Sequence, residues 1–195
     1  NLDRHLSRLS TAAAALMIAL AASVGVAVMV DSMRGAVSDW LRDLLTADLY
    51  IAAEGFQDGA TLPDGVLEQT SQIKAADDIS TYRKRILVTD AGRIVLVAGR
   101  LAARSRQGFR FVDVDAAAPW SGFDAGELLI SEPLAYRLKL GPGDTLALPT
   151  ATGERLFRVA AVFRDFASEH GRVFIDSHHY RRLWDDQRLD TLALF

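Results

Sequence analysis

The hydrophobic pattern of the chain begins with one long apolar run. No charged side chain occurs between Arg8 and Asp31, and residues 11–30 read TAAAALMIALAASVGVAVMV. A helix rises about 1.5 Å per residue, so this run reaches roughly 30 Å, the thickness of a bilayer's hydrocarbon core. The pattern predicts a transmembrane helix over 11–30 after a cytoplasmic flank over 1–10. A buried helix of a soluble protein is the alternative, and a cleaved signal peptide fits less well because no cleavage pattern interrupts the run.

A helical stripe of apolar residues continues beyond this run. Apolar residues fall at positions 33, 37, 40, 41, 44 and 45, which is the spacing of one helix face. The spacing predicts an amphipathic stalk helix over 31–46 that extends the membrane helix without a flexible linker. We expect the stalk to pack on the following domain through four side chains, Trp40, Leu41, Leu44 and Leu45.

The charges that flank the apolar run predict its orientation. Arg4 and Arg8 precede it, whereas Asp31, Arg34 and Asp39 follow it with mixed sign. Because basic residues favour the cytoplasmic side, the N-terminus is predicted to be cytoplasmic and everything after about residue 31 to lie outside.

After Ala47 the hydrophobic period changes from that of a helix to that of a strand. The clearest features are two hairpins, one turning at Asp90-Ala91-Gly92 and one at Thr152-Gly153-Glu154. Short helices break the series of strands, and such a series is typical of an α+β domain with a mostly antiparallel sheet, here spanning 47–195. The predicted strands are 48–53, 79–89, 93–100, 126–131, 145–148, 156–163, 172–176 and 191–195; the predicted helices are 63–71, 132–138 and 178–184; a turn is predicted at 55–59 and a loop-rich insertion at 101–125, with a possible strand at 109–112.

Composition narrows the class of protein. Half of the 195 residues are hydrophobic, which is enough for a substantial core. The formal net charge of -3 gives no support for nucleic-acid binding, and the absence of cysteine excludes disulfides and thiolate metal sites. The sequence starts without Met and stops inside an apolar run, so we expect it to be part of a longer chain.

The sequence contains no recognisable catalytic or cofactor-binding motif. The sequence contains no GxSxG, HExxH, GxxxxGK[ST] or GxGxxG element, so we expect neither an enzyme nor a cofactor site. His178 and His179 are adjacent on a predicted helix and point about 100° apart, so together with His170 they make a poor metal site. The basic run 83–85 alternates faces and is interpreted as a solvated strand edge, and the acidic pairs 77–78 and 185–186 as solvating turns.

Two segments of the chain resemble a known family. VMVDSMRGAVSDWLRDLLTADLYIAA and FRDFASEHGRVFI, together with LGPGDTLALPTATGERLFRVAAV and NLDRHLSR, resemble FtsX-like permeases of ABC transporters with a MacB-like periplasmic core domain. The matching positions are Asp31, Ser32, Arg34, Trp40, Leu41, Ala47, Asp48, Leu49 and Tyr50 in the first segment, and Arg164, Asp165, Phe166, Ala167, Ser168 and Gly171 in the second.

The resemblance implies a permease of the bacterial inner membrane that works with a separate cytoplasmic ABC ATPase. Such transporters act on lipids, lipoproteins or peptides, and the resemblance implies contact with membrane lipid, a periplasmic or lipoprotein partner, and an oligomer in the full transporter. It attaches no catalytic role to the motif positions, which we expect to be structural or to contact a partner. Arg164 and Asp165 are open to either role, as an internal salt-bridged pair or as a partner contact.

A ligand-sensing domain and a membrane-anchored hydrolase are the two alternative functions. The extracytoplasmic ligand-sensing domain of a membrane receptor would also follow a single span, but it should contain a deep, partly apolar pocket. A membrane-anchored hydrolase is disfavoured because no hydrolase motif is present.

Overall fold

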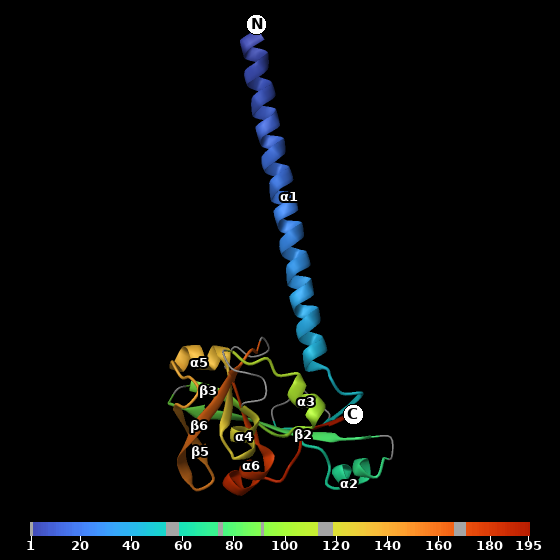
Figure 1. The fold of residues 1–195 in the computed structure, drawn as a ribbon, viewed down its shortest axis with the longest axis vertical. Helices are drawn as coiled ribbons and strands as arrows, with labels where there is room; N and C mark the ends of the chain where they lie inside the picture. The colour runs from blue at the N-terminus through green and yellow to red at the C-terminus, as the bar shows by residue number, and fades with distance from the viewer. Residues whose placement is uncertain (1, 54–58, 74–75, 91, 113–118, 166–170) are drawn as a thin grey trace. The chain divides into compact units, whose positions relative to one another are not determined.

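The computed structural model divides the chain into two compact units, residues 1–44 and 45–195. It describes residues 2–53, 59–73, 76–90, 92–112, 119–165 and 171–195, with the backbone alone for residues 2–11, 40, 43 and 44. The first unit is the single helix α1, Leu2–Leu44, drawn in blue in Figure 1. The predicted continuity of membrane helix and stalk is therefore confirmed, and the helix ends two residues before the predicted boundary.

The surface of α1 suits a membrane more than water. Residues Ala12–Asp39 are long and apolar enough to cross a bilayer by length and composition. Large apolar side chains are exposed around the helix, including Leu16 and Met29, so the helix buries no face within its own unit. Leu41 is 41% exposed, and the side chains of Trp40 and Leu44 lie outside the described part. Packing of the stalk on the domain stays a prediction.

The described residues of the second unit form an eight-stranded sheet. Its strand order is β1-β8-β2-β3-β7-β4-β6-β5. Neighbouring strands are antiparallel except for the pairs β3/β7 and β4/β6, so the predicted α+β class with a mostly antiparallel sheet is confirmed. The bounds are β1 Leu49–Ala52, β2 Ile79–Thr89, β3 Gly92–Arg100, β4 Leu128–Ser131, β5 Thr145–Thr150, β6 Gly153–Phe163, β7 Arg172–Asp176 and β8 Thr191–Leu194.

Both predicted hairpins form. Strands β2 and β3 close at Thr89 opposite Gly92, and β5 and β6 close at Thr150 opposite Gly153. Gly153 adopts φ +119°, a backbone conformation that a side chain would strain, which explains a glycine at this turn.

In the described part of the domain, five short helices surround the sheet. They are α2 Val66–Ser71, α3 Ala103–Gln107, α4 Pro119–Asp124, α5 Glu132–Leu138 and α6 Ser177–Trp184. Helices α3 and α4 lie in the stretch predicted to be loop-rich, and the possible strand at 109–112 is reduced to one bridge between Phe111 and Phe163. Helices of five and six residues are too short to show a helical period in the sequence, so the prediction missed them. Most of the turn predicted at 55–59 lies outside the described residues.

Alternate residues of the central strands divide between the two largest clusters of the core. Leu128 and Ile130 of β4 join a cluster with Leu134 of α5 and Trp184 of α6, whereas Leu129 packs in a second cluster with Phe123 of α4. Because strand side chains alternate between faces, α5 and α6 cover one face of the sheet and α4 covers the other. Figure 1 shows these helices around the strands of the second unit.

Candidate functional site

The first and last strands of the domain lie side by side at one edge of the sheet. Leu49 of β1 is opposite Leu194 of β8, and the Asp48 backbone N–H donates to the Leu194 carbonyl at 2.9 Å. The other end of the pair is closed by a bond of 3.0 Å from Ala53 N–H to the Asp190 carbonyl. The residue before β1 and the residue after β8 are therefore adjacent. We call this strand pair and its flanking residues 45–48 and 195 the β1–β8 junction.

One arginine of α3 contacts both sides of the β1–β8 junction. Arg104 Nη1 lies 3.1 Å from Asp48 Oδ2, and Arg104 Nη2 donates to the Thr46 carbonyl at 3.1 Å. The same guanidinium lies 5.0 Å from the centre of the Phe195 ring. The ion pair is exposed and contributes little stability, so Arg104 acts mainly by positioning these segments. Sequence reasoning missed Arg104 because no periodicity or motif marks it.

A buried cluster of charged side chains joins β2 to the segment that precedes β8. Arg83 of β2 and Asp186 are each 5% exposed, with Arg83 Nε 3.0 Å from Asp186 Oδ2. Arg83 Nη1 also pairs with Asp190 Oδ1 at 2.5 Å. Asp186 accepts further hydrogen bonds from the Tyr180 hydroxyl at 3.0 Å and from Arg188 Nε at 2.8 Å.

This cluster corrects two sequence interpretations. Strand β2 lies between β8 and β3, and the Arg83 side chain is 5% exposed, so Arg83 is not on a solvated edge. Asp186 is not a solvating turn residue, since its carboxylate is buried against Arg83. Both errors have one cause, because a buried ion pair joins residues 103 positions apart and leaves no local pattern.

The cluster also sets the ionisation of Asp186. Burial alone raises the pKa of a carboxyl group, but the hydrogen bonds from Arg188, Arg83 and Tyr180 outweigh it and hold the pKa of Asp186 well below its ordinary value. The carboxylate therefore stays charged throughout the physiological range. It ties β2 to the segment that leads into β8.

The depressed pKa predicts how stability depends on pH. The unfolded chain binds a proton to Asp186 at about pH 4, whereas the folded chain does so only at lower pH. The stabilisation from this carboxylate is thus complete above about pH 4 and lost as pH falls towards about 2. We expect the difference in free energy of unfolding between the natural chain and Asp186→Asn to narrow over that window in chemical denaturation. A difference that is constant with pH would contradict this assignment.

The motif positions of the first segment divide between the two units. Asp31, Ser32 and Arg34 are exposed on α1, and the Trp40 side chain lies outside the described part. Asp48 and Tyr50 lie at the β1–β8 junction, where the Tyr50 hydroxyl accepts from Ala47 N–H at 3.3 Å.

The motif positions of the second segment gather between β6 and β7. Arg164 is exposed, whereas Asp165 is buried and pairs with Arg172 Nε at 3.4 Å. Gly171 adopts φ +79° against Leu134 of α5, and its carbonyl accepts from Val95 N–H at 3.1 Å. The motif residues 166–168 lie outside the described part. The structure therefore places the two motifs at different sites and assembles no common catalytic centre from their described residues.

The described histidines make a packing contact. The rings of His178 and His179 lie 5.7 Å apart at nearly right angles, and His179 Nε2 lies 3.2 Å from the Asp124 carbonyl, to which it donates. Within the described ranges, no group of three or more His, Cys, Asp or Glu side chains is arranged to hold a metal ion. His170 lies outside them.

Comparison with known proteins gives concordant results. The profile of the family described as MacB-like periplasmic core domain matches residues 10–194. An uncharacterized ABC transporter permease protein of Mycobacterium tuberculosis is 32% identical over the whole of this chain, which spans 24% of that protein's length.

Two solved structures match most of this chain. The extracellular domain of the noncanonic ABC-type transporter YknZ from Gram-positive bacteria matches with a TM-score of 0.50 at 9% identity, over 75% of this chain and 81% of that one. The periplasmic region of MacB from Actinobacillus actinomycetemcomitans matches with a TM-score of 0.48 at 12% identity, over 74% and 72% of the two chains.

Proposed function

Because the chain belongs to the family of MacB-like periplasmic core domains, we propose that it supplies a transmembrane helix and the periplasmic domain of an FtsX-like ABC transporter permease. The permease couples ATP hydrolysis by a separate cytoplasmic ATPase to the export or extraction of a lipid, lipoprotein or peptide. Helix α1 crosses the inner membrane, and residues after about 31 lie in the periplasm. The chain itself performs no reaction.

The observation that supports this function most is the β1–β8 junction. The segment that joins α1 to the domain is hydrogen-bonded to the last residue of β8, through Asp48 N–H and the Leu194 carbonyl. A domain inserted between two membrane helices needs its two connections close together, so that movement of either helix reaches the same edge of the sheet. The continuous helix α1 adds a connection that transmits displacement better than a flexible linker.

The motif positions divide into two roles under this proposal. Asp165 and Gly171 are buried and stabilise the domain, whereas Arg164 is exposed and is available to a periplasmic or lipoprotein partner. On α1, Asp31, Ser32 and Arg34 are exposed and are available to other helices of an oligomeric transporter or to membrane lipid.

The ligand-sensing alternative receives less support. The hollow between β6 and α6 is open, and four of the ten residues that line it are charged, including Arg155 and Arg182. A sensing domain should instead enclose a deep, partly apolar pocket.

Affinity purification from the native membrane tests the proposed function. We expect the full-length protein to recover a cytoplasmic ABC ATPase, identified by mass spectrometry, and the purified complex to hydrolyse ATP. An unrelated membrane protein with the same tag, purified in parallel, controls for ATPases that bind the resin or detergent. Recovery of a kinase, or a complex without ATP hydrolysis, would instead favour the sensing domain.

A further inference from the structure

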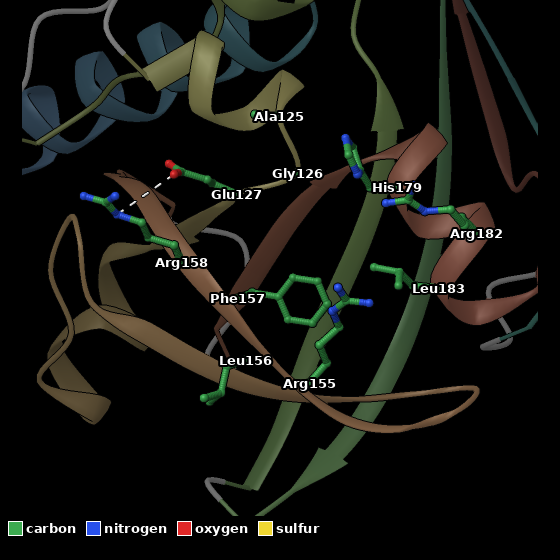
Figure 2. A pocket seen from close by; sticks show the side chains of 10 residues that line it. All are labelled: Ala125, Gly126, Glu127, Arg155, Leu156, Phe157, Arg158, His179, Arg182 and Leu183. Atoms are coloured by element: carbon green, nitrogen blue, oxygen red, sulfur yellow. Dashed lines mark ion pairs between the residues drawn. The ribbon is translucent and has the colours of Figure 1, made fainter.

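A basic hollow lies on the domain away from the β1–β8 junction. It has a volume of about 220 Å³ and is formed by β6, by α6 and by the segment that precedes β4. Figure 2 shows the side chains that matter here, Glu127, Arg155, Phe157, Arg158, His179 and Arg182. We call it the basic hollow below.

The basic hollow forms where one edge of β6 is left open. Strand β5 pairs with β6 over Gly153 to Arg158, but β4 pairs with the opposite side of β6 only from Val159 onward. Residues 155–158 thus have no strand partner on that side in the described chain. Because side chains of a strand alternate between faces, Arg155 and Arg158 start from opposite faces and both border this open edge.

Positive charge exceeds negative charge in the basic hollow. Three guanidinium groups line it, against one carboxylate, Glu127. Glu127 Oε1 lies 3.9 Å from Arg158 Nε, a loose pair with Arg158 65% exposed. Among the described residues, no carboxylate forms an ion pair with Arg155 or Arg182. The lining therefore carries an excess of two positive charges, on a chain whose formal net charge is -3.

The carboxylate of Asp124, close to the basic hollow, does not offset this excess of positive charge. Asp124 comes directly before Ala125, the first lining residue in the sequence. Its two carboxylate oxygens accept hydrogen bonds from Arg106, at 2.6 Å from Nη2 and 3.0 Å from Nη1. Its carbonyl faces His179 instead, at 3.2 Å from Nε2.

The floor and wall of the basic hollow are preformed. Phe157 is buried and stacks on Trp184, with ring centres 5.7 Å apart. Gly126 has φ +95°, and a Cβ there would lie 2.8 Å from His179 Nδ1, so the glycine lets the backbone meet the imidazole. A ligand would thus meet an ordered surface, which lowers the entropic cost of binding.

We propose that the basic hollow binds a phosphate monoester group. Such a group carries about -1.5 to -2 charges at neutral pH and three acceptor oxygens, which matches the excess charge and the forked donors of arginine. A single carboxylate would leave part of that charge unbalanced. Leu156 is 69% exposed beside the two arginines of β6, so an apolar chain attached to the phosphate would find a contact there.

Direct binding to the full chain in nonionic detergent tests the proposal apart from transport. Dihexanoyl phosphatidate, inorganic phosphate, dihexanoyl phosphatidylcholine and glutarate are titrated separately by calorimetry. We expect saturable binding of phosphatidate and weaker or no binding of phosphatidylcholine and glutarate. Tighter binding of phosphatidate than of inorganic phosphate assigns the group to a lipid, and equal binding assigns it to a soluble phosphate. Equal binding of glutarate, or no binding of either phosphate compound, would overturn the proposal.

Variants locate the binding. Arg155→Gln combined with Arg182→Gln should weaken phosphate binding by about tenfold or more, because two charge-assisted contacts are lost. Both side chains are exposed and unpaired with carboxylates in the described chain, so the fold should be kept, as far-UV circular dichroism would verify. Arg100→Gln, an exposed arginine at the end of β3 outside the hollow, is the matched control. A similar loss in the control would assign the binding to the general charge of the surface and refute the site.

Discussion

Replacing Asp186 by asparagine is expected to lower the free energy of unfolding at pH 7 by about 3 kcal/mol. The substitution keeps the shape of the side chain but removes the negative charge opposite Arg83 Nε, and the Arg83 side chain is 5% exposed. Breaking a buried ion pair typically costs about 3–5 kcal/mol, and the lower end applies because Asp190 still pairs with Arg83. Urea unfolding in detergent, followed by tryptophan fluorescence, measures the change.

The neighbouring residue provides the control for this variant. Asp185 is exposed and has φ +49°, a left-handed conformation that asparagine accepts readily. Asp185→Asn removes the same charge one position away and should change the free energy of unfolding by less than about 0.5 kcal/mol. Equal effects of the two variants would show that net charge, and not the buried charge cluster, determines the result.

Replacing Gly171 by alanine is expected to destabilise the domain by about 3 kcal/mol. Two costs add. A φ of +79° strains any residue with a Cβ, and the new methyl group would lie 2.7 Å from Leu134 Cβ and 3.2 Å from Leu134 Cα. Because one of these contacts is with the backbone of α5, a side-chain rotation cannot relieve it. The same denaturation experiment measures the loss.

A second glycine separates these two costs. Gly65 has φ +86°, and a Cβ there would meet nothing within 4 Å. Gly65→Ala should therefore show only the backbone strain, about 1–2 kcal/mol. If Gly171→Ala cost no more than Gly65→Ala, α5 would have to move away freely, and close packing between Gly171 and α5 would not explain the glycine at this motif position.

Some elements of the fold were predictable from the sequence and others were not. The long apolar helix α1, both hairpins, α5 and β7 follow from local signals, because an apolar run, alternation and a Gly turn each act within a few residues. Helices α3 and α4 gave no such signal. Their contacts are tertiary: Trp120 of α4 packs against Phe109 with ring centres 5.4 Å apart, and Arg106 of α3 pairs with Asp124 of α4.

The candidate site was predicted only in part. Asp48 and Tyr50 were selected by the family resemblance, and the structure places them at the β1–β8 junction. Arg104, which contacts the same junction, was not selected, and Arg83 and Asp186 were assigned to solvent. The basic hollow was not predicted either, because Arg155, Arg158 and Arg182 come from a strand and a helix that are separate in the sequence.

The sequence by itself determined the class of fold, the long apolar helix and the family, since these depend on periodicity, composition and motifs along the chain. Only the tertiary structure decided which charges are buried and which are exposed. Arg83 and Asp186 meet across 103 positions, and Arg155 and Arg182 share a hollow while lying on different elements. The reason is that the ionisation and the binding capacity of a side chain depend on its neighbours in space. Those neighbours are set by the order of the strands, which local sequence patterns do not specify.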